Sequence, residues 1–541
     1  MRADIFNKLV VVLGFLFLMV SCKTNQSKDD SKPSSKPNIV FIMADDHAVA
    51  AISAYKDWLS EIAPTPNIDK IADQGMLMMN TYNTNSICGP SRSAILTGKY
   101  SHINGFFKNE KGGDFDGTQQ TFPKLLQKAG YETAVIGKWH LGTVPTGFDY
   151  SKVMINWGGQ GTYFNTVYLE NGKDTIRETK RHSTAQVAHD ALNWLDKDRD
   201  KSKPFMLMYQ FKAPHRPWEP ADEFKELFTD GDLPHPPNFN DDYKGRIAAG
   251  EQWMEIAHHM NRKDLKITPP ENLTKRKLNT WNAFGNKEGE EWTPNDTLQG
   301  AALKNWKYQT YVKDYLRVVA GVDKAVGQMI DYLKKNDLYE NTIIVYTSDQ
   351  GFYLGEHGWF DKRFMYEESF RMPFMISYPK MIKPNTKNKE LLLNIDFAPT
   401  LLDLAGVEIP KDMQGTSFKE QLIGEKNAKT RDAVYYHYYE YPKWHMVQPH
   451  YGVRTDRFKL IHFYYNIDEW ELYDLKNDKY EMDNLYGKEG YEEITATLKK
   501  RIKELQKEFN DDMSLNEMRA MTDVVIERVY NEENINKPLK K

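Results

Sequence analysis

The segment with the clearest chemical potential surrounds Cys88, one of only two cysteines in the 541-residue chain. Residues 88–98 read Cys-Gly-Pro-Ser-Arg-Ser-Ala-Ile-Leu-Thr-Gly, which places the guanidinium of Arg92 four residues after the cysteine. A lone cysteine is most often a small buried apolar residue, and less often the centre of covalent chemistry. The other cysteine, Cys22, has its own local explanation at the N-terminus, so we expect no disulfide.

Four oxygen-bearing side chains follow two short apolar runs. Asp45 and Asp46 come directly after the first run, and Asp349 and Gln350 follow a late one. Carboxylate and amide oxygens suit Ca²⁺ or Mg²⁺, and the sequence has no histidine and cysteine cluster at zinc spacing. An aspartate pair after a strand is also common as a turn or a helix cap.

Basic and imidazole side chains recur in short blocks between the apolar runs. Lys138 and His140 lie in Gly-Lys-Trp-His-Leu-Gly, His215 lies in Ala-Pro-His-Arg-Pro, and Lys362 lies in Trp-Phe-Asp-Lys-Arg. Each of these residues alone could be an ordinary surface lysine or a histidine bonded to backbone. Their shared position after apolar runs suggests that they work together.

The elements that must position these residues are short strands alternating with helices. A parallel sheet gathers active residues beyond the carboxyl ends of its strands, and four runs end in polar, chemically capable groups. We therefore expect an α/β fold with a large, mostly parallel sheet flanked by helices. The predicted strands are 38–43, 133–136, 205–209 and 342–346, and the predicted helices are 122–129 and 311–335.

The character of the chain changes after Gly415. Short β-type runs at 434–439 and 458–465 precede a helix from about residue 491, which predicts a smaller antiparallel sheet with one packed helix. The polar stretch from 230 to 300 is expected to be a long surface excursion over the cleft. We therefore divide the chain into a catalytic domain at 38–415 and a C-terminal α+β subdomain at 416–541.

The N-terminus is predicted to be a targeting segment. A positively charged start and an apolar run at 9–20 precede Ser21-Cys22, which resembles a bacterial lipobox. Residues 1–22 would then be a lipoprotein signal peptide with Cys22 as the lipidated residue, and the polar residues 23–37 a flexible tether. We expect an exported bacterial lipoprotein anchored to the outer membrane, at its periplasmic face or on the cell surface.

Composition excludes one broad class of partner. The formal net charge is −4 and no long basic run is present, which argues against a nucleic-acid ligand. A polyanionic substrate would have to be bound by a local basic pocket.

The segment at 88–98 resembles the signature of the formylglycine-dependent (type I) sulfatase family, Cys-x-Pro-Ser-Arg followed by Leu-Thr-Gly. The resemblance extends over nearly all of residues 38–530 and implies an alkaline-phosphatase-like fold. It also implies that Cys88 is oxidised to formylglycine by a formylglycine-generating or anaerobic sulfatase-maturating enzyme. A hydrated aldehyde carries two hydroxyls, so one can attack sulfur and the other can expel sulfate by re-forming the aldehyde.

The same resemblance assigns the metal and the charged groups. It implies one Ca²⁺ held by four side chains and the formylglycine hydroxyl, with Gln350 standing where the family more commonly has asparagine. Lys138 and Lys362 would bind sulfate oxygens, and His140 would accept the proton of the second hydroxyl. His215 and Lys362 would protonate the leaving oxygen, and Arg92 would steady the formylglycine end. The four metal-binding side chains are Asp45, Asp46, Asp349 and Gln350.

The substrate implied by the resemblance is a sulfated carbohydrate, such as N-acetylglucosamine 6-sulfate in a host glycan or an algal sulfated polysaccharide. Candidate sugar-binding residues are Asp361, Arg363, His450 and His47. Two alternatives remain at this point. One is a phosphatase or phosphonate monoester hydrolase of the same superfold, and the other is a non-catalytic glycan-binding lipoprotein.

Overall fold

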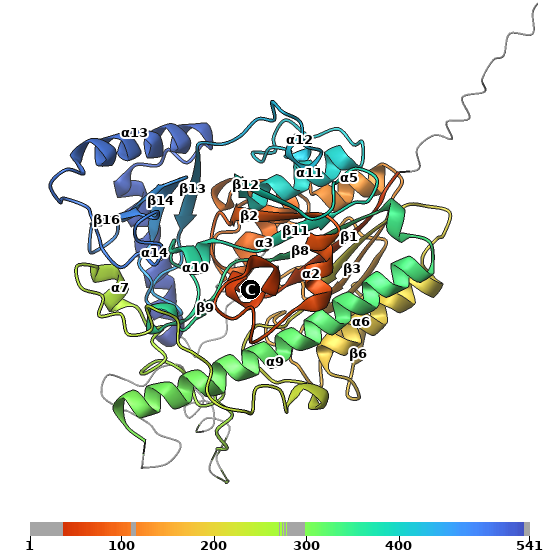
Figure 1. The fold of residues 1–541 in the computed structure, drawn as a ribbon, viewed down its shortest axis with the longest axis horizontal. Coiled ribbons are helices and arrows are strands. Elements are labelled where there is room, and N and C mark those ends of the chain that lie inside the picture. Colours follow the sequence, from red (N-terminus) through yellow and green to blue (C-terminus); the bar gives the residue numbers. More distant parts are fainter. Residues whose placement is uncertain are drawn as a thin grey trace, which may run out of the picture. The chain divides into compact units, whose positions relative to one another are not determined.

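A mixed sheet with buried parallel strands at its centre organises the fold (Figure 1). The strand β1 (Asn38–Ala44) pairs in parallel with β7 (Phe205–Gln210) and β8 (Thr342–Ser348), and β3 (Glu132–Gly137) pairs in parallel with β7. All residues of β1, β7 and β8 are buried, as expected for strands covered on both faces. The four runs predicted as strands are confirmed, each extended by one or two residues.

The sheet has ten strands in the order β12-β2-β11-β8-β1-β7-β3-β4-β5-β6. The strand β11 is antiparallel to both of its neighbours, and β5 and β6 are antiparallel at the far edge. The prediction of a large, mostly parallel sheet in an α/β fold is therefore confirmed. The strands not predicted from the sequence are β2 (Met76–Tyr82), β4 (Tyr150–Met154), β5 (Val167–Glu170), β6 (Asp174–Arg177), β11 (Phe374–Ser377) and β12 (Thr386–Leu393).

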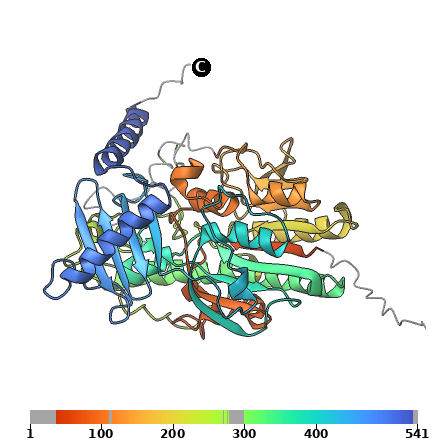
Figure 2. The same cartoon turned by 90° about the horizontal axis from the view of Figure 1, so that it is seen from above.

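Helices cover both faces of this sheet, as Figure 2 shows from above. Alternate side chains of β1 divide between two apolar clusters: Val40 and Ile42 join one, and Ile39 and Phe41 join the other. The first face is covered by α2 (Pro66–Asp73), α6 (Ser183–Asn193) and α9 (Gly300–Lys335), and the second by α3 (Cys88–Thr97), α5 (Phe122–Lys128) and α11 (Phe397–Leu404).

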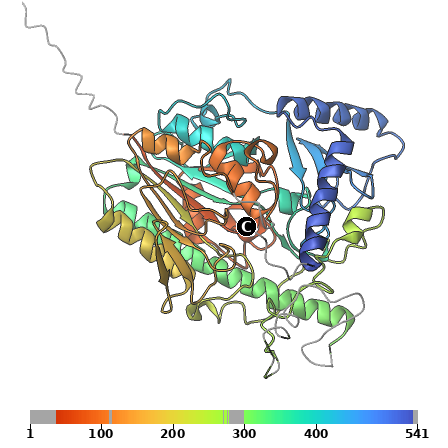
Figure 3. The same ribbon diagram turned by 180° about the vertical axis from the view of Figure 1, so that it is seen from behind.

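The C-terminal part contains the predicted smaller antiparallel sheet (Figure 3). Its strands follow chain order: β13 (Ala433–Tyr438), β14 (His450–Thr455), β15 (Phe458–Phe463) and β16 (Glu469–Asp474). The helix α13 (Glu492–Glu508) packs on it through the buried Leu498, Ile502 and Leu505 and the partly buried Ile494. A further helix, α14 (Leu515–Asn534), was not predicted.

Short elements complete the architecture. They are β9 (Tyr353–Leu354), β10 (Phe360–Asp361), α4 (Ser101–Asn104), α7 (Ile247–Glu251), α10 (Glu367–Phe370) and α12 (Lys419–Leu422). The computed structural model describes residues 36–109, 115–269, 271, 272, 274, 277 and 298–534. Cys22, the predicted signal peptide and residues 23–35 of the predicted tether lie outside this range. Within the described residues, no helix combines the length and the apolar character that crossing a bilayer requires.

Candidate active site

Most of the candidate catalytic and metal-binding residues meet because they follow four adjacent parallel strands. The strands β8, β1, β7 and β3 are neighbours in that order, so their carboxyl ends lie at one edge of the sheet. Asp349 and Gln350 follow β8, and Asp45 and Asp46 follow β1. His215 comes after β7, and Lys138 and His140 come after β3. The strand-end argument from the sequence is confirmed in this respect.

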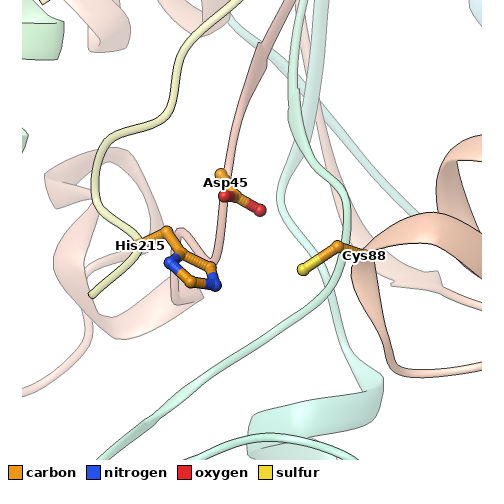
Figure 4. Close-up of side chains that lie close together, drawn as sticks. All are labelled: Asp45, Cys88 and His215. Atoms are coloured by element: carbon orange, nitrogen blue, oxygen red, sulfur yellow. The ribbon is translucent and has the colours of Figure 1, made fainter. Parts of the chain in front are cut away.

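Cys88 reaches the same edge of the sheet from a helix and not from a strand, because it is the first residue of α3. Its side chain is buried, and its Sγ lies 3.8 Å from Oδ1 of Asp46. Figure 4 shows Asp45, Cys88 and His215 converging, and their ligand-type atoms all lie within 4.8 Å of one another. Burial raises the pKa of the Cys88 thiol well above its ordinary value. The partial positive charge of the helix N-terminus faces the same point.

Three fully buried carboxylates form the floor of the site. Oxygen atoms of Asp45, Asp46 and Asp349 lie within 4.8 Å of one another. Burial raises the pKa of Asp46 to about 6. Burial and the negative charge of Asp45 together raise the pKa of Asp349 to about 7. Burial also acts on Asp45, but the charges of Lys138 and Arg92 hold the pKa of Asp45 well below its usual range. Three clustered carboxylates of this kind need compensating positive charge.

The donor set fits a hard divalent cation. Oδ1 of Asp45 and Oε1 of Gln350 are buried and accept no hydrogen bond from any described residue. Nε2 of Gln350 donates to Oδ1 of Asp46, so the amide is oriented with respect to the carboxylates. Buried oxygen atoms with unused lone pairs, drawn from carboxylates and an amide, are the ligands that Ca²⁺ and Mg²⁺ prefer. These residues could therefore hold such an ion.

Arg92 connects three strand ends beneath the carboxylates. Its Nε donates to Asp349 Oδ2 at 3.0 Å, and one terminal nitrogen donates to the Lys138 carbonyl at 2.9 Å and to Gln210 Oε1 at 3.0 Å. Because the side chain is only 2% exposed, these bonds are made in a low-dielectric environment and fix the groups firmly. Arg92 acts here by orienting Asp349 and the Lys138 backbone.

Two buried lysines contact the carboxylates beside Cys88. Lys138 Nζ contacts Asp45 and also donates to Gln160 Oε1 at 2.5 Å. Lys362 Nζ lies 2.7 and 2.8 Å from the two carboxylate oxygens of Asp46. Burial disfavours the charge on Lys362, but the carboxylates of Asp361 and Asp46 outweigh burial and raise its pKa. Lys362 therefore carries a proton at neutral pH.

The two histidines of the site are neutral. Burial and the charge of Lys138 lower the pKa of both His140 and His215 well below the ordinary value. His215 Nδ1 donates to the Arg216 carbonyl at 2.7 Å, which leaves the Nε2 lone pair directed to the site, 3.8 Å from Asp46 Oδ2. Nδ1 of His140 is buried and has no hydrogen-bond partner among the described residues, so it is available to a ligand.

A cavity of about 530 Å³ opens above these groups. Cys88, His140, His215 and Lys362 line it, and so do two of the predicted sugar-binding residues, Asp361 and Arg363. A volume of this size suits a small organic ligand in addition to a sulfate-sized group.

Asp361 is the centre of a charge network on the cavity wall, and sequence reasoning missed three of its members. The Asp361 carboxylate lies 3.1 Å from Arg216, 2.5 Å from Arg363 and 3.2 Å from Nε2 of His445. Arg216 also contacts Asp264 at 2.7 Å. Asp361 and Arg363 lie in one segment and were predicted, whereas Arg216, Asp264 and His445 come from other loops. Of these three, only Arg216, directly after His215, gave any signal in the sequence.

The predictions for His47 and His450 differ from the structure. His47 is completely buried, with Nδ1 bonded to the Tyr346 hydroxyl at 2.6 Å, and burial lowers its pKa to about 4. His450 is also completely buried, and its Nε2 accepts a hydrogen bond from the Met365 amide at 3.1 Å. Neither residue lines the cavity, so both are corrected to supporting roles inside the fold.

Comparison with known families agrees with this geometry. Residues 37–407 match the family described as Sulfatase. The chain belongs to the sulfatase family. Residues 355–508, which include the small sheet, match the family described as N-sulphoglucosamine sulphohydrolase, C-terminal. The protein is therefore a sulfuric ester hydrolase, and the alternative of a phosphatase or a non-catalytic binding protein is set aside.

Individual members of the sulfatase family show high similarity to this chain. This sulfatase is 46% identical over 525 residues to an N-acetylglucosamine-6-O-sulfatase of Bacteroides thetaiotaomicron, covering 94% of this chain and 92% of the relative. It is 28% identical to an arylsulfatase of Clostridium perfringens, covering 87% and 95% of the two chains. A solved structure of a protein in complex with its substrate D-glucosamine-2-N,6-O-disulfate superposes with a TM-score of 0.81 at 46% identity, covering 88% of this chain and 99% of the other.

Proposed function

We propose that this sulfatase hydrolyses the 6-sulfate ester of N-acetylglucosamine or a closely related N-substituted glucosamine in glycans, and releases inorganic sulfate. The observation that carries the proposal is the 46% identity to an N-acetylglucosamine-6-O-sulfatase over almost the full length of both chains. The cavity above Cys88 supports it, because the same space holds charged residues for a sulfate at the base and polar residues for a sugar on the wall.

The reaction needs a nucleophile that can release the sulfate again. We propose that Cys88 is converted to formylglycine, which supplies a hydrated aldehyde with one attacking hydroxyl and one hydroxyl that permits release. Asp45, Asp46, Asp349 and Gln350 would hold one Ca²⁺, which supplies Lewis acidity and charge neutralisation when bound.

The remaining steps belong to side chains of this chain. Lys138 and Lys362 contact the carboxylates of the floor, close to Cys88, and would bind sulfate oxygens. His140, neutral and with a free Nδ1, is the acceptor for the proton given up when sulfate is released. Lys362 is the proton donor to the leaving sugar oxygen, and the Nε2 edge of His215 orients that oxygen.

A sulfate-release screen tests the substrate. The enzyme, produced together with a sulfatase-maturating enzyme, is given N-acetylglucosamine 6-sulfate, N-acetylglucosamine 3-sulfate and N-acetylgalactosamine 6-sulfate at equal concentration. We expect release from the first at a rate at least tenfold above the others. Equal rates, or preference for the galactosamine sugar, would overturn the assignment. Mass spectrometry of the Cys88 peptide provides the control that the nucleophile has been formed.

We also propose that the enzyme is exported and lipid-anchored at Cys22. The support is the sequence alone: a charged start, an apolar run, and a serine directly before the cysteine. Incorporation of labelled palmitate in a bacterial host, compared between the native chain and Cys22→Ala, tests the anchor. Equal labelling of both chains would contradict it.

A further inference from the structure

The rim of the cavity carries a second group of residues that the chemistry above does not use. Trp157 and Trp444 both line the cavity, and they are 55% and 50% exposed. Large apolar side chains left half in water cost free energy, so two of them at one opening indicate a ligand surface. Tryptophan offers a flat apolar face and suits the C–H face of a pyranose ring.

A cation accompanies the first of these tryptophans. Lys263 also lines the cavity, and its Nζ lies 3.2 Å from the centre of the Trp157 ring. The other lysines and arginines of the lining are Arg216, Lys362 and Arg363, and each is paired with a carboxylate. Lys263 makes no such ion pair with any described acidic residue. Its charge is therefore available to an anionic group on a ligand.

The loop that carries Trp157 is tied to the catalytic residues. Gln160 on the same loop accepts a hydrogen bond from Lys138, and a Cβ added to Gly159 would lie 3.3 Å from the Cα of His140. Trp157 itself has a φ of 57°, a backbone conformation that non-glycine residues rarely adopt. The loop thus connects the segment that carries Trp157 to Lys138 and His140 in the base of the site.

We propose that Trp157, Trp444 and Lys263 form a second subsite, which binds the sugar next to the sulfated one and pairs Lys263 with an anionic group on that sugar. The inference rests on the proposed function, because it takes a 6-sulfated glucosamine as the sugar in the base of the cavity. The tryptophan faces bind the ring of any neighbouring sugar. Lys263 adds a preference for a neighbour that bears a carboxylate or a sulfate, as a uronic acid does.

The test compares one monosaccharide with two disaccharides. The substrates are N-acetylglucosamine 6-sulfate, the same sugar linked to galactose, and the same sugar linked to a uronic acid. We expect kcat/KM to be higher for both disaccharides and highest for the uronic acid. Trp157→Ala should reduce the ratio of disaccharide to monosaccharide kcat/KM about tenfold, and Lys263→Ala should reduce only the uronic-acid ratio, by a similar factor.

Matched controls come from the same surface. Trp253 is 50% exposed and does not line the cavity, and Lys266 pairs with Asp314 at 3.4 Å outside it. Trp253→Ala and Lys266→Ala should therefore keep the wild-type ratios. A wild-type enzyme without preference for disaccharides, or a Trp157→Ala ratio equal to that of the wild type, would overturn the second subsite.

A binding measurement separates this inference from the proposed function. Calorimetric titration of the same three saccharides into the Cys88→Ala protein needs no turnover and no assumption about which ester is cleaved. We expect both disaccharides to bind about tenfold more tightly than the monosaccharide, and Trp157→Ala to remove that gain. If the wild-type enzyme releases no sulfate from any of these sugars, the proposed function fails. Equal affinity for all three saccharides overturns the subsite whatever the activity.

Discussion

Replacement of Lys362 tests the central assignment in the mechanism. Its Nζ touches both carboxylate oxygens of Asp46, at 2.7 and 2.8 Å, in a side chain that is only 4% exposed. Lys362→Met keeps the length of the stem and removes both the charge and the transferable proton. Loss of one preorganised cationic donor costs about 10²–10³ in kcat, and loss of a general acid costs about 10²–10⁴.

The contribution of the positive charge of Lys362 can be separated from that of its proton by changing the leaving group of the substrate. A sugar alkoxide leaves as an alcohol and needs a proton, whereas a nitrophenolate leaves without one. We therefore expect Lys362→Met to lower kcat about 10³-fold on N-acetylglucosamine 6-sulfate, and at least tenfold less severely on 4-nitrophenyl sulfate. Sulfate release measured by ion chromatography gives both values. Equal losses on the two substrates would refute the proton-donor role, and a loss below tenfold on the sugar would remove Lys362 from the catalytic set.

A matched variant controls for structural damage. Lys459 is equally buried, and its Nζ lies 2.9 Å from Glu367 and 2.7 Å from Glu481, but it does not line the cavity. Breaking a buried ion pair costs about 3–5 kcal/mol of stability in either place. Lys459→Met should therefore lower the thermal midpoint as Lys362→Met does, while the folded enzyme keeps its turnover. A comparable loss of kcat in Lys459→Met would mean that the effect at Lys362 is structural.

Three further predictions concern the nucleophile, the metal and the pH range of stability. Cys88→Ala should lower sulfate release by more than about 10⁴-fold with a thermal midpoint close to that of the wild type, and substantial residual activity would contradict the nucleophile assignment. Dialysis against a chelator should remove most of the activity, and added Ca²⁺ should restore it; an enzyme whose activity survives chelation would exclude the metal. Gln350→Ala should weaken Ca²⁺ binding about tenfold, as measured by calorimetry. Burial disfavours the charge on His357, but the hydrogen bond between Nδ1 and Asp241 and the carboxylate of Glu368, 3.8 Å from Nε2, outweigh it and raise the pKa of His357 from 6.5 to about 9. Protonated His357 therefore stabilises the folded state fully below pH 6.5, and this contribution is lost as the pH rises through 9. In urea titrations, His357→Gln should lower the free energy of unfolding by about 3 kcal/mol at pH 6 and by little at pH 10.

The sequence was most informative where chain order and strand geometry agree. Asp45, Lys138, His215 and Asp349 each follow a buried strand, and parallel strands place such residues at one edge whatever the loops between them do. The centre of the sheet and the base of the site could therefore be predicted without an alignment. The strand β11 was missed because its four residues lie in a short apolar stretch with no flanking catalytic motif.

Residues that depend on loop conformation could not be predicted in the same way. His47 follows the aspartate pair in sequence, yet its ring turns into the core against Tyr346. Asp264 and His445 are far from Asp361 in sequence but join it at the cavity wall, directly or through Arg216. No periodicity or short motif in the sequence predicts these contacts, because they depend on the conformation of long loops over the edge of the sheet.

The separation of strand-end residues from loop residues has a consequence for how such enzymes diverge. Most of the groups proposed to act on sulfate follow the ends of buried strands, whereas Trp157, Lys263 and Trp444 lie on connecting segments. Exchange of those segments would redirect the enzyme to a new glycan while leaving bond cleavage intact. Sulfatases that share the residues at the strand ends could thus differ in substrate through the residues at the rim alone.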